Sequence, residues 1–194
     1  IGANGEAACC VYLMRHAQTY GNSKGVLNGV RNDLGLTKKG AMQAKRAAAA
    51  LTIRPEIILC SPQRRAIETA AQIAKNTGAR IEIVKELHEQ DCGDWTGKSI
   101  ASLQKRYPSY FVKYKQRLTR IFSSSPNGET IGQMQKRARK VISLISKKYK
   151  SRPLMVVTHG VVIRVFLYEL GLVGSIGEAM AKRVPNCSIV RIAF

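Results

Sequence analysis

Continuous apolar runs of strand length recur along this chain and alternate with segments of helical periodicity. Strands that are apolar throughout are buried on both faces, and such burial is typical of a mostly parallel sheet covered by helices. The expected strands are residues 7–14, 56–60, 80–84, 153–158 and 187–194. The expected helices are residues 37–52, 61–78, 129–150 and 160–171. The alternation predicts an α/β fold of three layers, in which helices flank a mostly parallel sheet.

Two of these helices carry clear signals at their ends or along one face. Residues 61–78 offer Ser61 as N-cap, Pro62 at the first helical position and Gly78 as the stop. Residues 129–150 carry an apolar stripe close to the 3.6-residue period, so we expect this helix to pack on the sheet. The stripe consists of Ile131, Met134, Ala138, Val141, Ile142, Ile145 and Tyr149.

The length of 194 residues suits a single domain with its own core. Residues 86–128 are expected to leave the sheet as a helical excursion that overhangs its ligand-binding edge, with helices near 99–106 and 108–120. No apolar run reaches the roughly 18 residues that a membrane span needs, so no transmembrane segment is expected. The sequence begins at Ile1 rather than Met, so targeting stays open.

The cysteines and the charge balance restrict the class of protein. Five cysteines without a C-x-x-C pair argue against a disulfide framework or a zinc site, and favour reduced thiols in the cytoplasm or another intracellular compartment. The net charge of +20 predicts attraction to polyanions. Residues 105–120 mix Tyr and Phe with basic side chains, which suits single-stranded nucleic acid, a phosphorylated substrate or simply a local core. The basic residues 136–150 could form a nucleic-acid or membrane-binding helix, but an amphipathic helix packed on the sheet with its basic face in water is the favoured interpretation.

Charged and polar side chains follow three of the expected strands at the point where each ends. Arg15 and His16 end the first strand, residues 61–65 follow the second, and His159 with Gly160 follows the strand at 153–158. Ligands of open α/β sheets bind beyond the carboxyl ends of the strands, where helix N-termini also favour anions. The sequence therefore predicts an anion-binding pocket that holds two imidazoles.

The two histidines and the arginines of this pocket favour phosphoryl transfer to a histidine. The chain lacks the glycine-rich nucleotide loops and the G-x-S-x-G elbow of serine hydrolases. A neutral imidazole can attack phosphorus while arginines stabilise the equatorial oxygens, and a carboxylic acid must protonate the leaving alkoxide. Glu86, Glu89, Asp91 and Asp94 are all candidates for that acid, and spacing alone does not choose among them.

Five motifs resemble those of the histidine phosphatase superfamily, in its phosphoglycerate-mutase-like branch. They occur in the expected order and read MRHAQTYGN, SPQRRAIETA, LHEQDCGDWTG, NGETIGQMQKR and VVTHGVVIR. The resemblance spans residues 9 to about 164, and together the five motifs are highly specific. It implies the phosphoglycerate-mutase-like fold and a phosphatase that works through a phosphohistidine, without a metal, nucleotide or other cofactor.

The same resemblance implies a role for each matched position. His16 would be the nucleophile and Glu89 the proton donor. Arg15, Arg65 and His159 would form the phosphate clamp. Asn22 and the backbone of Gly160 would assist that clamp. Arg64 is expected to face solvent, and His88 to be an ordinary loop residue.

The sequence departs from the family motif at Ala17, where the family has glycine. A methyl group there is expected near the pocket floor, where it would slow turnover or shift the bound phosphate. The stretch between Trp95 and Glu129 is short, which resembles the phosphatases rather than the mutases of the family. A phosphorylated small molecule or macromolecule is therefore the expected partner. Two alternatives stay open: a phosphoglycerate-type mutase, and a basic polyanion-binding protein on an inactive scaffold.

Overall fold

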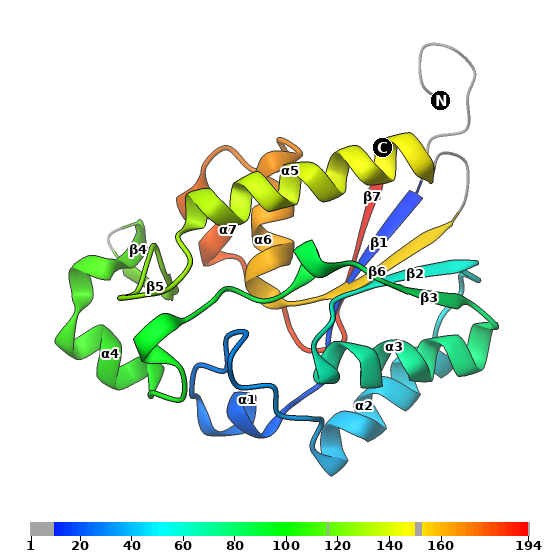
Figure 1. Cartoon of the computed structure of the whole chain (residues 1–194), viewed down its shortest axis with the longest axis horizontal. Coiled ribbons are helices and arrows are strands. Elements are labelled where there is room, and N and C mark those ends of the chain that lie inside the picture. The colour runs from blue at the N-terminus through cyan, green and yellow to red at the C-terminus, as the bar shows by residue number, and fades with distance from the viewer. Residues whose placement is uncertain (1–9, 116, 150–152, 194) are drawn as a thin grey trace.

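A five-stranded sheet forms the centre of the protein, as the computed structural model of residues 10–115, 117–149 and 153–193 shows (Figure 1). The strands are β1 (Cys10–Arg15), β2 (Ile57–Cys60), β3 (Arg80–Ile83), β6 (Leu154–Thr158) and β7 (Ile189–Ala193). Their order is β3-β2-β6-β1-β7, and only β7 runs antiparallel to its neighbour. The expected mostly parallel sheet is thereby confirmed. Residues 7–9, the start of the first expected strand, lie outside the described residues.

Helices cover both faces of the sheet, which makes the three layers that the sequence predicts (Figure 1). The helices are α1 (Tyr20–Lys24), α2 (Lys38–Ala49), α3 (Arg64–Thr77), α4 (Ile100–Arg106), α5 (Ile131–Lys148), α6 (Gly160–Glu169) and α7 (Ile176–Ala181). Helices α2 and α3 pack on one face, and α5 and α6 on the other. Strand β6 is buried along its whole length because it lies in the middle of the sheet between both apolar layers. The helices α1 and α7 are additions to the predicted set.

Helix α5 confirms the predicted amphipathic helix with shorter bounds, Ile131–Lys148 in place of 129–150, and residue 150 lies outside the described residues. It begins after Thr130, whose hydroxyl accepts a hydrogen bond from the backbone of Gln133 in a capping box. Of its predicted stripe only Ile142 is partly buried, and the other members belong to the core beneath the helix. The basic residues of this segment that remain exposed therefore cover one outer face of a packed helix.

Helix α3 starts later than the sequence suggests. Its N-cap is Gln63, not Ser61, so Pro62 precedes the helix. The reason is that Ser61 still belongs to the sheet edge, where its backbone N–H donates to Val157 O at 3.0 Å. The other end agrees with expectation: Gly78 adopts a left-handed φ of 77° and stops the helix.

The prediction of a helix at 108–120 is wrong, whereas α4 confirms the predicted helix near 99–106. A short 3-10 helix (Pro108–Tyr110) is followed by a hairpin of β4 (Phe111–Tyr114) and β5 (Arg117–Phe122). Lys115 turns the chain with a positive φ of 47°. The aromatic side chains explain the change, because Trp95 stacks on Tyr107 and Phe111 with ring centroids 5.5 and 5.8 Å apart. Phe111 and Tyr107 thus belong to a small local core, whereas Tyr110 stays exposed.

Candidate active site

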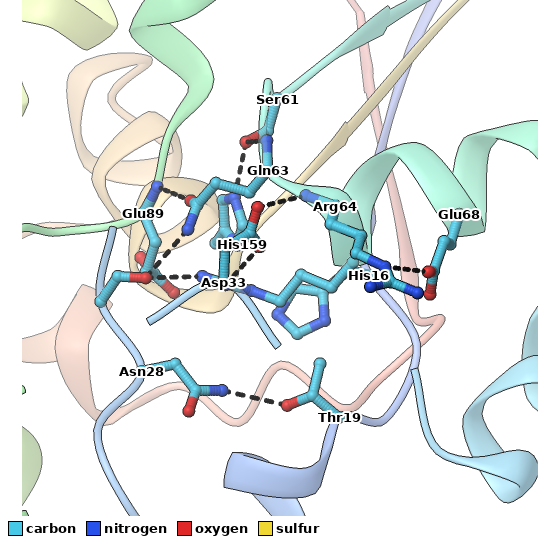
Figure 2. Close-up of polar contacts among 12 residues, drawn as sticks. His16, Thr19, Asn28, Asp33, Ser61, Gln63, Arg64, Glu68, Glu89 and His159 are labelled. Atoms are coloured by element: carbon cyan, nitrogen blue, oxygen red, sulfur yellow. Dashed lines mark hydrogen bonds and ion pairs between the residues drawn. The ribbon is translucent and has the colours of Figure 1, made fainter. Parts of the chain in front are cut away.

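Strand register brings the two histidines of the predicted site side by side. Arg15, the last residue of β1, lies opposite Thr158, the last residue of β6. His16 and His159 are the next residues on these neighbouring strands, and their ring centroids are 5.1 Å apart (Figure 2). The parallel pairing of β1 with β6 is therefore what converts two distant motifs into one site.

His16 is held as a neutral imidazole with a defined tautomer. Its side chain is 2% exposed, and burial, followed by the charges of Arg65 and Arg15, lowers its pKa well below 6.5. The ring Nδ1 lies 2.7 Å from the carbonyl oxygen of Ala17. Since a carbonyl oxygen only accepts hydrogen bonds, Nδ1 carries the proton and Nε2 keeps its lone pair. Nε2 of His16 is thus the ring nitrogen that carries no proton.

His159 is the second buried imidazole, and it is also neutral. Its ring Nε2 lies 2.8 Å from Ser61 Oγ. Burial is the largest cause that lowers its pKa well below 6.5, and the charge of Arg65 adds to it. Its Nδ1 is buried and has no hydrogen-bond partner among the described residues. Such an orphaned polar atom is costly, and an oxyanion bound beside it would satisfy a proton carried there.

Two arginines border the imidazoles. Arg65 is 1% exposed in the first turn of α3, where its guanidinium donates to Gly29 O at 2.9 Å and to Asp33 at 3.3 Å. Arg15 donates from Nη1 to Val184 O at 2.7 Å. Burial lowers the pKa of Arg65, while the nearby carboxylates Glu89 and Asp33 oppose that shift. Its Nε has no partner among the described residues.

Of the four acidic candidates, Glu89 is the one that reaches the pocket. Its backbone N–H donates to Gln63 Oε1 at 2.7 Å, which fixes the loop against the start of α3 (Figure 2). Asp91 is paired with Arg31, and Asp94 accepts from Asn127 Nδ2. Glu86 does not line the cavity within the described residues.

Asn22 and Gly160 also lie at the cavity, as the resemblance implies. Asn22 Oδ1 accepts a hydrogen bond from Asn186 Nδ2 at 3.3 Å. Gly160 is the first residue of α6, and a Cβ there would lie 3.0 Å from Arg164 Nη1 and 3.4 Å from Arg15 Nε. The glycine therefore allows two guanidinium groups to approach the start of the helix.

The cavity has a volume of about 1160 Å³ and opens beyond the carboxyl ends of the parallel strands. Residues of the excursion form one wall: Ile100, Tyr114, Lys115, Thr119 and Ile121. Arg164 and residues 180–186 form another. A cavity of this size exceeds what a phosphate group fills, so it offers room for a sizeable organic leaving group.

Arg64 and Ala17 were also singled out in the sequence. Arg64 is exposed and pairs with Glu68 at 2.6 Å, as expected. Ala17 is fully buried and is absent from the cavity lining, and its φ is not positive, so the alanine causes no backbone strain there. Its expected effect on turnover or on the bound phosphate stays a prediction. Its N–H donates to Thr69 Oγ1, which stabilises the loop after His16.

Several supporting side chains were not predicted from the sequence. Ser61 was interpreted only as a helix N-cap and Gln63 was not singled out, although both contact the site. Asn186 donates to His16 O at 2.8 Å from a segment 170 residues away in the chain. Only Ser61 had a usable signal, because it directly follows a strand that ends beside β6.

A model of the histidine phosphatase superfamily (branch 1) matches residues 11–194. The chain belongs to this superfamily. Among curated relatives, a putative phosphoserine phosphatase 2 of Hydrogenobacter thermophilus is 30% identical over 151 residues, which are 77% of this chain and 72% of the relative. Phosphoglycerate mutase-like protein 4 of Arabidopsis thaliana is 30% identical over 163 residues, 82% of this chain and 69% of the relative.

Solved structures of the superfamily share the fold. The native structure of a mycobacterial glucosyl-3-phosphoglycerate phosphatase aligns with a TM-score of 0.78 at 24% identity, covering 95% of this chain and 90% of the other.

Within the described ranges, no helix is long and apolar enough to cross a membrane. Over the same ranges, His, Cys, Asp and Glu side chains form no group of three that could hold a metal ion.

Proposed function

We propose that this superfamily member is a phosphatase that hydrolyses phosphomonoesters through a phosphohistidine at His16, without a metal ion. One observation carries the proposal: the hydrogen bond from Nδ1 to Ala17 O leaves Nε2 of a neutral, buried imidazole as the nucleophile. The relatives named as phosphatases support the reaction class. The net charge of +20 also favours anionic, phosphorylated substrates.

In the first step, His16 Nε2 attacks the phosphorus atom and the ester P–O bond breaks. The electron pair of that bond goes to the leaving oxygen, which takes a proton from the Glu89 carboxyl group. Arg15 and Arg65 hold the equatorial oxygens, whose negative charge must be stabilised in the transition state. Arg65 Nε and His159 Nδ1, which have no hydrogen-bond partner among the described residues, are proposed as further donors to these oxygens.

In the second step, water attacks the phosphohistidine and gives a proton to Glu89. The P–N electron pair returns to Nε2 of His16, and inorganic phosphate leaves. Glu89 thus alternates between acid and base, and the enzyme ends in its starting state.

Hydrolysis is favoured over transfer to a second substrate because the cavity is wide. Transfer by a mutase requires that the phosphorylated intermediate be retained and shielded from water. A cavity of about 1160 Å³ leaves space for water around a small substrate such as a phosphoglycerate. A mutase would instead exchange phosphoryl groups between two positions of its substrate faster than it released phosphate.

The test is phosphate release from p-nitrophenyl phosphate by the wild type and by His16→Ala, at moderate salt and with EDTA present. We expect turnover by the wild type and none by the variant. Arg139→Gln, an exposed site on α5 outside the cavity, is the matched control and should keep wild-type activity. Loss of wild-type activity with EDTA would contradict metal independence. Turnover by a folded His16→Ala would contradict the nucleophile.

A further inference from the structure

Arg164 adds a third guanidinium to the cavity, and the phosphate clamp described above does not use it. It lies one turn into α6, four residues after Gly160. Its Nη1 approaches the start of that helix next to Arg15, which is also the phosphate-binding end of the cavity. Arg164 is therefore close to the reacting centre without belonging to the set of side chains proposed to react.

The hydrogen bonding of Arg164 leaves one end of its guanidinium available. Nε donates to Lys182 O at 2.8 Å. Across the described part of the chain, no carboxylate forms an ion pair with Arg164 and no acceptor is bonded to its Nη atoms. Burial, and then the charge of Arg15, lower its pKa to about 10, while the charge of Glu89 opposes this shift. A partly buried cation beside another cation is unfavourable unless an anion joins them.

The charge balance of the cavity leads to the same conclusion. Its described lining contains the cationic side chains Arg15, Arg65, Lys115, Arg164, Lys182 and Arg183. Glu89 is the single carboxylate of that lining. Arg15 and Arg65 are already assigned to the reacting phosphate, and Lys182 pairs with Glu178 at 3.7 Å. Arg164 and Arg183 are therefore the cations of the wall formed by α6 and residues 182–183 that form no ion pair within the described part of the chain.

We propose that Arg164 binds a second anionic group of the substrate, a carboxylate or another phosphate near the reacting ester, through its two Nη atoms. The guanidinium fork matches the paired oxygens of either group. Arg164 is then a specificity-determining residue, and the preferred substrates are phosphomonoesters that carry an additional oxyanion. This inference rests on the proposed phosphatase function.

Two substrate pairs isolate the second anion. O-phosphoserine differs from O-phosphoethanolamine by one carboxylate, and fructose 1,6-bisphosphate differs from fructose 6-phosphate by one phosphate. We would measure kcat and KM for all four with the wild type, Arg164→Gln, Arg164→Lys and the control Arg139→Gln. Binding of the same compounds to His16→Ala, by calorimetry, gives affinities that do not depend on turnover.

The wild type should prefer the additional anion in at least one pair. In that pair, Arg164→Gln should lower kcat/KM for the more anionic member about 10- to 100-fold, mainly through KM, because a charge-assisted contact is lost. The less anionic member should change less than about threefold, and Arg164→Lys should recover part of the loss because it keeps the charge. The pair that responds identifies the carboxylate or the phosphate as the bound group.

Three results would overturn the inference. Equal losses on both members of each pair would mean that Arg164 only anchors the backbone at Lys182. An unchanged Arg164→Gln would mean that the cation takes no part in binding. If calorimetry shows that His16→Ala binds both members of each pair equally well, the inference is rejected, even where the wild type shows no turnover. By contrast, an inactive wild type whose binding preference depends on Arg164 would refute the proposed function and leave the anion site standing.

Discussion

Gln63 connects the proposed proton donor to the phosphate clamp, and Gln63→Leu tests that connection. The side chain is 3% exposed at the start of α3. Its Oε1 accepts from Glu89 N at 2.7 Å, and its Nε2 donates to Gly29 O at 2.9 Å, the same carbonyl that accepts from Arg65. Leucine preserves the approximate volume and removes both hydrogen bonds.

The cost in stability follows from these contacts. Gly29 O keeps its bond to Arg65, but the backbone N–H of Glu89 loses its partner. Two lost hydrogen bonds with one unsatisfied donor should lower the free energy of unfolding by about 2–3 kcal/mol. For a chain of this size the melting temperature should fall by about 4–12 °C.

The effect on activity should depend on the leaving group. An alkoxide leaves poorly without a proton, whereas p-nitrophenolate leaves well without one, so a displaced Glu89 matters only for the alkyl ester. The ratio kcat/KM reports formation of the phosphoenzyme. For an alkyl phosphate it should fall about 10- to 100-fold in Gln63→Leu, and for p-nitrophenyl phosphate by less than about threefold.

Asn76→Leu is the matched control at the other end of α3. Asn76 donates to Ala48 O at 2.8 Å, so this variant also loses a side-chain hydrogen bond to the backbone. It should lower the melting temperature without changing the ratio of alkyl to aryl activity. Two results would refute the positioning of Glu89 by Gln63. Gln63→Leu could reduce kcat/KM by the same factor for the alkyl and the aryl ester, or it could leave kcat/KM unchanged for both.

Three further predictions concern stability. Burial keeps His16 and His159 neutral in the folded protein, so the unfolded chain binds more protons as pH falls below about 6.5. The free energy of unfolding, measured in urea, should therefore fall by up to about 1.4 kcal/mol per pH unit for each histidine. A free energy that stays constant between pH 7.5 and 5.5 would contradict this. Arg137→Met leaves the partly buried Glu129 without its ion pair, removes the hydrogen bond to Glu86 O and should cost about 3–5 kcal/mol, part of which adding Glu129→Gln should recover; no recovery would exclude the ion pair as the cause. Ala17→Gly should lower stability by about 1 kcal/mol with activity within about twofold, and a large gain in activity would show that alanine obstructs the site.

The sequence was sufficient for the sheet and for the two histidines. Each histidine follows a continuous apolar run, and parallel strands place their carboxyl ends at one edge. The pairing of Arg15 with Thr158 then follows from the strand order β6-β1, which brings the two side chains together. Apolar runs of strand length, together with the rule that parallel strands end at one edge of the sheet, were enough to predict the sheet and the pair of histidines.

The excursion and the outer wall of the cavity were not predictable in the same way. In residues 108–120, Phe111, Tyr114 and Leu118 recur at helical spacing, whereas Tyr110, Val112 and Tyr114 alternate as in a strand. The choice between the two depends on the packing of Phe111 against Trp95, which the local pattern does not encode. Arg164 resembles any polar residue of a helix until the backbone at Lys182 is folded against it. Asn186 reaches His16 across 170 residues of sequence, a contact that no local pattern encodes.

Detection of the phosphoenzyme tests the central claim most directly. The wild type and His16→Ala would be mixed with a phosphomonoester, quenched on the millisecond scale in alkali and analysed by peptide mass spectrometry. We expect one added phosphoryl group on the peptide that contains His16, formed before phosphate release, stable in alkali, lost in acid and absent from the variant. Rapid turnover with no phosphorylated intermediate, or phosphate on another residue, would contradict the account.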